Sequence, residues 1–225
     1  DLPAIKRKSL MKAMFKKAGV NSAPGMIIKS AAQARKFARE VGYPIIIKPD
    51  IGVGAAKTYK FENQAELDVF LSTLPPVDYY LEKYISGEAV TFDGLTDQNG
   101  DLVFYSSLKY SQGVMETVNE DRDIYYYILR EIPAEIEKAA RAIIKAYGIK
   151  ARFFHFEFFV TPEGPLALEV NMRPPGGLTT DMWNYANDID IYHEWANVLL
   201  HNRFDSMVSR PYFCCYIGRK SKLAY

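Results

Sequence analysis

Apolar residues follow two different spacings along the chain, and these spacings predict a mixture of helices and strands. Residues four positions apart, such as Leu10, Met14 and Ala18, predict a helix, whereas alternating or short continuous apolar runs predict strands. The predicted helices cover about residues 3–18, 31–41, 64–74, 134–147 and 181–200. The predicted strands cover residues 43–50, 57–61, 78–85, 88–96, 101–110, 151–160 and 165–172.

Short polar signals mark where several of these elements begin and end. Ser30 with Gln33 has the spacing of a helix-capping pair, and residues 63–66 repeat it. Asn99 and Gly100 are typical of a tight hairpin turn, so the strands beside them should pair antiparallel. The order of elements predicts an α+β protein with two lobes. We expect residues 1–20 to form an N-terminal helix and linker, 21–85 a small lobe, 86–204 a large lobe and 205–225 a tail.

The stretch LEVNMRP places Glu169, Asn171 and Arg173 at every second position, which is the spacing of one face of a strand. If the hairpin loop before this strand has three residues, Glu157 lies opposite Glu169 on the paired strand, and His155 faces Asn171. The reverse face should then form the core, with Phe154, Phe156, Phe158, Val160, Leu166, Leu168, Val170 and Met172.

Two interpretations of this polar face are open. Solvated acids on the outer side of a half-buried sheet are one of them. The neighbours Phe153, Phe159 and Ala167 are poor residues for a solvent face, which favours a sheltered site instead. Two carboxylates and an amide oxygen are hard ligands that suit Mg²⁺, which shares its other positions with water and nucleotide phosphates. A guanidinium on the same face suits a phosphoryl group that carries developing negative charge.

The stretch KPDIGVGAAKT contains Gly52 and Gly54 but matches neither of two common phosphate-binding loops. It lacks the glycine that a Walker A loop has before its lysine, and it lacks the third glycine of a kinase or dinucleotide loop. A flexible hairpin turn is therefore one interpretation. Because strands are predicted on both sides, the other is a glycine-rich lid whose amides cover phosphates, with Lys48 as the counter-charge.

Charge and composition exclude some classes of partner. The 225 residues include 28 basic and 27 acidic side chains, so the net charge of +1 creates no overall field that favours nucleic acid or an anionic membrane. No apolar run approaches the ~20 residues that span a bilayer. The two cysteines, Cys214 and Cys215, are adjacent, which fits neither a disulfide framework nor a zinc site. We therefore expect a cytoplasmic protein with small-molecule partners, and no nucleic acid or membrane partner.

Taken in order, the motifs IIIKP, GVGA, LEKYISGE, FEFF and LEVNMRP resemble those of the ATP-grasp superfamily, which includes carbamoyl-phosphate synthetase, biotin carboxylase and D-alanine:D-alanine ligase. The resemblance covers nearly all of the chain up to about Phe204. It implies an α+β fold in which two lobes with antiparallel sheets grip ATP between them. It also implies ATP and Mg²⁺ as cofactors, with Mn²⁺ as an allowed substitute.

The resemblance further implies roles for individual residues. Lys8 and Lys48 would bind the phosphates under a lid at Gly52 and Gly54, and Arg173 would stabilise the transferred phosphoryl group. The implied metal ligands are Glu157, Glu169 and Asn171. The implied adenine and ribose contacts are Glu82, Lys83, Tyr84, Ile85 and Glu88. Weaker candidates on the substrate side are His155, Lys109, Gly176 and Gly177. The alternatives are a hydrogen bond to Asn171 for His155, and a solvated surface charge for Lys8 and Glu88.

The implied reaction transfers the γ-phosphoryl group of ATP to a carboxylate and forms an acyl phosphate, which an amine or another nucleophile then attacks. Such a ligase depends on positioning and charge neutralisation more than on covalent catalysis by the protein. A non-catalytic ATP-binding regulatory module and a metal-dependent hydrolase are the competing interpretations. Most family members have a substrate-binding domain before this segment, so the resemblance implies a missing N-terminal domain and an isolated domain that can be inactive. The sequence also allows a homo-oligomer.

Overall fold

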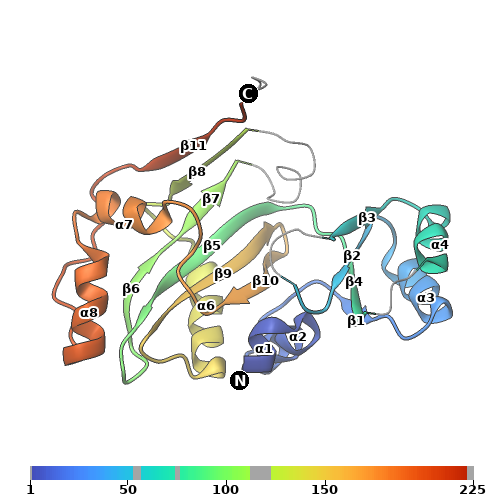
Figure 1. The fold of residues 1–225 in the computed structure, drawn as a ribbon, viewed down its shortest axis with the longest axis horizontal. Coiled ribbons are helices and arrows are strands. Elements are labelled where there is room, and N and C mark those ends of the chain that lie inside the picture. Colours follow the sequence, from blue (N-terminus) through green and yellow to red (C-terminus); the bar gives the residue numbers. More distant parts are fainter. Residues whose placement is uncertain (1, 53–56, 74–76, 112–122, 222–225) are drawn as a thin grey trace.

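The computed structural model describes residues 2–52, 57–73, 77–111 and 123–221, and it contains two antiparallel sheets with helices packed against them (Figure 1). The helices are α1 (Leu2–Lys6), α2 (Lys8–Lys17), α3 (Ala31–Val41), α4 (Gln64–Ser72), α6 (Ala134–Tyr147), α7 (Thr179–Asn187) and α8 (Ile191–His201). The strands are β1 (Gly25–Ile27), β2 (Ile45–Pro49), β3 (Tyr59–Phe61), β4 (Tyr79–Lys83), β5 (Glu88–Thr96), β6 (Leu102–Ser106), β7 (Leu108–Tyr110), β8 (Ile124–Ile128), β9 (Arg152–Thr161), β10 (Gly164–Asn171) and β11 (Cys215–Gly218).

The smaller sheet has four strands in the order β1-β4-β2-β3, and its neighbouring strands pair antiparallel. Ile45, Ile47 and Leu81 are fully buried on one face because α3 and α4 pack against them. These two helices lie together on the outer side of the sheet, at the right of Figure 1. The opposite face is thereby turned toward the rest of the molecule, and it carries Lys48 and Glu82.

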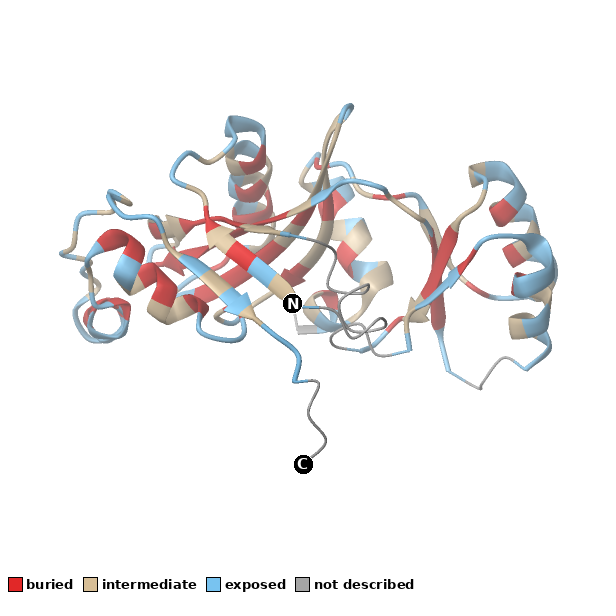
Figure 2. Ribbon diagram, turned by 90° about the horizontal axis from the view of Figure 1, so that it is seen from above, coloured by how far each residue is buried: buried red, intermediate tan, exposed pale blue. Residues whose placement is uncertain are grey.

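The larger sheet has seven strands, of which six follow the order β10-β9-β5-β7-β8-β11, while β6 pairs with β5. α2 and α6 pack on one face, where Phe92, Phe154 and Phe156 are fully buried. α7 and α8 pack on the other face, where Phe104 and Trp183 are fully buried. Figure 2 shows the buried residues concentrated along the strands and on the helix sides that face them. The α+β architecture with two antiparallel sheets is confirmed.

Several predicted boundaries are confirmed by capping interactions at the helix ends. The side chain of Ser30 accepts a hydrogen bond from the N–H of Gln33 at the start of α3. Asn63 does the same for the N–H of Glu66 at the start of α4. α6 ends at Gly148, whose φ of 61° is the left-handed conformation that favours glycine. Local polar signals therefore located these ends correctly.

The β9–β10 hairpin reaches the predicted pairing by a different route. Thr161 pairs with Gly164, so the loop between them has two residues and not three. That shorter loop would move every pair by one position, but the register shifts between Ala167 and Glu169, where Leu168 is the extra residue. As a result Glu169 lies opposite Glu157, as predicted.

The bulge changes which side chains of β10 face the core. Before it, Ala167 pairs with Phe158 and is 2% exposed in the core beside α2 and α6. Leu166 and Leu168 instead line a cavity on the other face. The prediction of Leu166 and Leu168 in the core was therefore wrong, because the sequence does not reveal where a bulge reverses the alternation. Ala167, predicted beside the acids, lines the cavity and also packs in the core.

Two predicted helices are each divided in two. The N-terminal helix is interrupted at Arg7, whose extended backbone forms an isolated bridge to Ile51 and whose guanidinium lies 3.4 Å from the Asp50 carboxylate. The last helix is interrupted where Asp188 adopts the left-handed conformation and the side chain of Asp190 caps α8. Both breaks depend on polar contacts that helical periodicity does not register.

Two short strands, β1 and β8, were not predicted as strands. β11 pairs with β8 and so adds a strand to the larger sheet from the part of the chain expected to form a tail. The strand predicted over residues 101–110 is divided at Ser107, whose hydroxyl donates to the Thr91 carbonyl. These short elements depend on pairing with distant strands rather than on their own sequence pattern.

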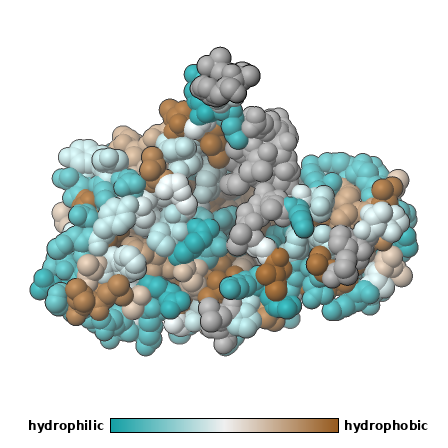
Figure 3. All heavy atoms as spheres, viewed as in Figure 1, coloured by the Kyte–Doolittle hydropathy of each residue, from teal (hydrophilic) through white to brown (hydrophobic). Residues whose placement is uncertain are grey.

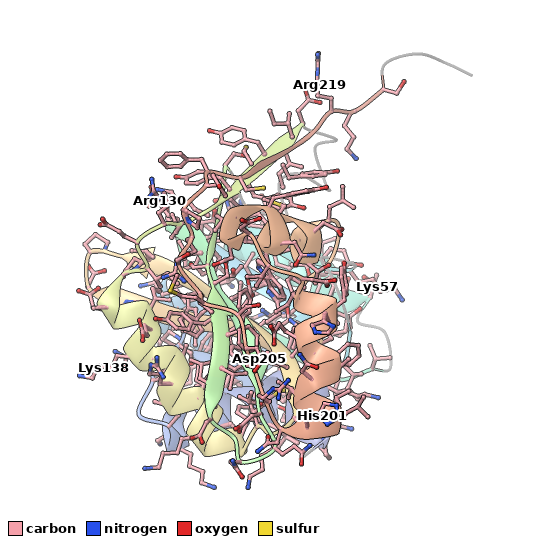
Figure 4. All side chains as sticks on the ribbon, turned by 90° about the vertical axis from the view of Figure 1, so that its left-hand side faces the viewer. Lys57, Arg130, Lys138, His201, Asp205 and Arg219 are labelled. Atoms are coloured by element: carbon pink, nitrogen blue, oxygen red, sulfur yellow. The ribbon has the colours of Figure 1, made fainter. Side chains whose placement is uncertain are left out.

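The surface agrees with the near-neutral composition. Hydrophilic residues dominate the face shown in Figure 3, and the apolar residues on it form separate small patches. In the side view of Figure 4, Lys138 on α6 points away from the molecule. Within the residues that the structure describes, no helix is long and apolar enough to cross a membrane.

Candidate functional site

A cavity of about 370 Å³ lies between the two sheets, and it brings together side chains from distant parts of the sequence. α2 contributes Lys8 and Lys12, and the smaller sheet contributes Lys48 and Glu82. Lys83, at the end of β4, and the segment that follows it, with Tyr84, Ile85 and Gly87, also line the cavity. The larger sheet and the segment after it contribute Val90, Tyr110, Glu157, Leu166, Leu168, Glu169, Asn171 and Arg173.

On one side of the cavity two lysines share a single buried acid. Glu82 is 4% exposed, and its carboxylate contacts the ammonium of Lys48 and lies 3.2 Å from that of Lys12. Burial alone would raise the pKa of Glu82, but the two ammonium groups outweigh burial and lower the pKa to about 2. Glu82 is therefore a permanent anion between two cations.

Lysine charge exceeds acid charge on this side. Burial lowers the pKa of Lys12, although Glu82 opposes that effect, and burial likewise lowers the pKa of Lys8. The Lys8 ammonium donates a hydrogen bond of 3.2 Å to the Gly52 carbonyl, which places it at the start of the predicted lid. Lys8, Lys12 and Lys48 lie on the same side of the cavity, and the buried carboxylate of Glu82 pairs with only two of them. The remaining positive charge favours binding of an anion here.

On the other side of the cavity two carboxylates face each other. Glu157 and Glu169 are direct partners on β9 and β10, and Asn171 follows on the same face. Burial raises the pKa of Glu169, and the charge of Glu157 raises it further. Burial would also raise the pKa of Glu157, but the hydrogen bond and charge of His155 lower it. The pair would gain stability from a cation between its two carboxylates.

Glu157, Glu169 and Asn171 suit a divalent cation that takes only some of its ligands from the protein. Among the described residues no group of three His, Cys, Asp or Glu side chains is arranged to hold a metal. Glu157, Glu169 and the amide oxygen of Asn171 would supply three oxygen ligands and leave the remaining positions for water and phosphate. That division is typical of Mg²⁺ at nucleotide sites.

His155 lies behind the acidic pair and not in the cavity lining. It is 4% exposed, its Nδ1 lies 2.6 Å from Asp93, and its Nε2 lies 3.1 Å from Glu157. Burial would lower the pKa of His155, but Asp93 and Glu157 outweigh burial and raise the pKa to about 10. The alternative of a hydrogen bond from His155 to Asn171 is not what the structure shows, although the two residues are strand partners.

Most of the predicted site residues converge on this cavity. Those that line it are Lys8, Lys48, Glu82, Lys83, Tyr84, Ile85, Glu157, Glu169, Asn171 and Arg173. Gly52 is outside the lining but bonds Lys8, and Gly54 lies outside the described residues. Backbone groups of residues 82–85 are expected to contact adenine, and two of them, the N–H groups of Lys83 and Tyr84, donate to the carbonyls of Pro24 and Pro44.

Besides His155 and Gly52, four predicted residues in the described part of the chain are outside the cavity lining. Glu88 and Lys109 pair with each other at 2.7 Å on neighbouring strands, so the expected ribose contact of Glu88 competes with an ion pair. Gly176 and Gly177 lie in the segment between β10 and α7, and an added Cβ on Gly177 would lie 3.0 Å from the Tyr126 hydroxyl. Gly176 and Gly177 therefore follow Arg173 along the chain without lining the cavity.

Sequence reasoning missed Lys12, Asp93 and Tyr110. Lys12 is four residues after Lys8 on α2, so both point to one side of the helix, and this spacing could have identified it. Asp93 is 62 positions from its partner His155, and only the β5–β9 register brings them together. No local signal would have found that pair.

Comparison with known proteins agrees with this geometry. Residues 72–181 match the family model of the ATP-grasp domain. The large chain of carbamoyl phosphate synthase from Clostridium acetobutylicum is 25% identical over 175 residues, which are 71% of this chain and 15% of that protein. This chain thus spans only a small part of that relative.

Solved structures share the fold. Biotin carboxylase from Campylobacter jejuni, in a complex with β-γ-ATP, superposes with a TM-score of 0.72 at 21% identity, over 96% of this chain and 49% of that one. The biotin carboxylase domain of 2-oxoglutarate carboxylase from Hydrogenobacter thermophilus, in complex with MgADP, ADP and bicarbonate, gives 0.69 at 23% identity, over 89% and 46%. Residues 72–181 are therefore identified as an ATP-grasp domain, and the solved structures share the fold of the chain.

Proposed function

We propose that this chain binds ATP with Mg²⁺ in the cavity between its sheets and transfers the γ-phosphoryl group to a carboxylate substrate. The resulting acyl phosphate is then attacked by an amine or another nucleophile. The observation that carries the proposal is the charge distribution of one cavity, in which three lysines face a pair of carboxylates. A polyphosphate with a bound cation has the complementary charges.

The lining residues would offer a separate place for each part of the nucleotide. Ile46, Val90 and Leu168 make an apolar region beside residues 83–85, which suits a purine ring. Lys8, Lys12 and Lys48 would hold the phosphates. The 4% exposure of Glu82 leaves it as a fixed support for two of these lysines rather than a group that contacts adenine through its side chain.

The reacting end of the nucleotide would lie at the acidic side. Glu157, Glu169 and Asn171 would hold Mg²⁺, which when bound neutralises phosphate charge. Arg173 lines the same side, and its guanidinium also donates to the Pro174 carbonyl at 2.8 Å. There it can stabilise negative charge as the bond from the γ-phosphorus to ADP breaks and a bond to the substrate oxygen forms.

A non-catalytic nucleotide-binding module is the alternative that shares the cavity. It would need the lysines and the apolar region, but not Arg173 beside the paired acids, so that arrangement favours the ligase. A metal-dependent hydrolase would leave the lysine cluster without a role. The similarity to carbamoyl phosphate synthase and to the biotin carboxylase domain is low, so it does not identify the substrates of this chain. The carboxylate and the nucleophile have to be found by experiment.

The test is carboxylate-dependent turnover. The protein would be incubated with ATP, Mg²⁺, hydroxylamine and panels of carboxylic acids, including bicarbonate and amino acids, while ADP and hydroxamates are measured. The proposal expects ADP formation that depends on one class of acid, and loss of that activity in Arg173→Met. Tight Mg²⁺-dependent nucleotide binding without acid-dependent ADP formation across the panels would support the non-catalytic module instead.

A further inference from the structure

A chain of hydrogen bonds runs from the interior of the larger sheet to Glu157 and ends there. Asp93 and His155 are direct cross-strand partners on β5 and β9. His155 lies two residues before Glu157 on β9, so both side chains project from the same face. His155 therefore bridges Asp93 and Glu157 through its two ring nitrogens.

The inner end of this chain is fixed to backbone. Asp93 and Thr91 are both fully buried, and the Thr91 hydroxyl donates to Asp93 Oδ2 at 2.6 Å. The same hydroxyl oxygen accepts a hydrogen bond of 3.0 Å from the N–H of Leu108, the first residue of β7. Asp93 is thus held through Thr91 by a third strand, and its other oxygen is left for His155 at 2.6 Å.

The outer end determines how Glu157 is presented. His155 Nε2 lies 3.1 Å from Glu157 Oε1 and forms a hydrogen bond with it. The other oxygen, Oε2, is left to bind a cation in the cavity. A carboxylate with one oxygen held has fewer orientations to lose when it binds a cation, so its affinity is higher. The network reaches Glu157 on β9, whereas Glu169 and Asn171 belong to β10, so the support is specific to the β9 ligand.

We propose that His155, anchored by Asp93 and Thr91, is a positioning residue that orients Glu157 for the divalent cation of the nucleotide site. The inference rests on the proposed function, because it assigns a role toward the cation that this function requires. It differs from the earlier expectation for His155, which was a contact with phosphate or substrate. His155 acts through Glu157 and touches neither nucleotide nor substrate.

Two substitutions at one position separate this role from a purely structural one. His155→Asn places an amide near the Nδ1 position, where it can still meet Asp93, but it is too short to reach Glu157. His155→Gln places an amide near the Nε2 position, where it can donate to Glu157. Both lose an imidazole from the core, so packing alone would not favour Gln, whereas the positioning role would.

The measurement is Mn²⁺ affinity, read from the electron paramagnetic resonance of free Mn²⁺ in the presence of a non-hydrolysable ATP analogue. We expect His155→Asn and Asp93→Asn to weaken Mn²⁺ binding about 10–100-fold and His155→Gln to recover part of that loss. Affinity for the analogue without metal should stay within about twofold. A control is Glu194→Gln on α8, a buried acid that accepts from the Asp205 N–H and the Ser206 hydroxyl and is outside the cavity lining.

The outcomes separate this inference from the function on which it rests. Wild-type Mn²⁺ affinity in folded His155→Asn or Asp93→Asn overturns the inference alone, as does an equal loss in Glu194→Gln. Failure of the wild-type protein to bind Mn²⁺ with the analogue overturns the proposed function and this inference together. Thermal unfolding of each variant shows which variants are folded. If the His155 variants are not folded, the Mn²⁺ affinity of Asp93→Asn tests the inference.

Discussion

Replacing Glu82 with Gln tests the buried charge arrangement on the lysine side of the cavity. Gln has nearly the same size but no charge, so the substitution leaves Lys12 and Lys48 close together without the anion between them. Both lysine side chains are largely buried, at 9% and 11% exposure, so water cannot replace the lost partner. The free energy of unfolding of the variant should therefore fall by an amount that corresponds to the lowering of the Glu82 pKa.

The magnitude follows from the lowered pKa. A fall from 4.5 to about 2 corresponds to roughly 3 kcal/mol of folding free energy at neutral pH. Because the folded pKa lies below the unfolded one, this contribution is fully present above pH 4.5 and is lost as the pH falls toward 2. The difference in unfolding free energy between wild type and Glu82→Gln should be about 3 kcal/mol at pH 7 and less than half of that at pH 3.

Urea denaturation at a series of pH values measures this difference directly. The matched control is Glu88→Gln, which removes the same charge from a carboxylate that is 62% exposed and paired with Lys109. That surface pair should contribute no more than about 1 kcal/mol. Equal stability of Glu82→Gln and wild type at pH 7, or a difference that does not change with pH, would refute the reasoning.

Two further predictions concern nucleotide binding. Lys12→Met should weaken binding of a non-hydrolysable ATP analogue by about tenfold or more, since a charged hydrogen bond is worth about 1.5–3 kcal/mol. The control Lys138→Met, on the exposed side of α6, should leave the affinity unchanged. Equal affinities of the two variants would show that Lys12 does not bind the phosphates. Bound phosphates favour the charged form of Lys8 and Lys12, so nucleotide binding should take up protons and should weaken as the pH rises through the lowered pKa values of these lysines. Calorimetry in buffers of different ionisation enthalpy measures the proton uptake. Release of protons on binding would contradict this prediction.

The sequence predicted the parts of the fold that local chemistry decides. The caps at Ser30 and Asn63 and the end of α6 at Gly148 each depend on residues within one helical turn. The alternation of Glu169 and Asn171 identified one side of the cavity for the same reason, because side chains on a strand alternate between its faces. These features need no knowledge of distant segments.

The sequence did not predict features that depend on distant contacts. The Glu157–Glu169 pairing was predicted from a three-residue loop, yet it forms because a two-residue loop and a bulge at Leu168 compensate each other. The break at Arg7 and the burial of Asp93 arise from contacts with residues more than 40 positions away. Such contacts belong to the tertiary structure, so periodicity and capping rules carry no information about them.

The central claim is that the paired acids hold a divalent cation for a nucleotide bound by the lysines. Calorimetric titration of the protein with a non-hydrolysable ATP analogue, with and without Mg²⁺, tests it against Glu169→Gln. Mg²⁺ should tighten binding to the wild-type protein, and Glu169→Gln should lose this dependence while it retains metal-free binding. No binding by the folded wild-type protein, or an unchanged effect of Mg²⁺ in Glu169→Gln, would contradict it.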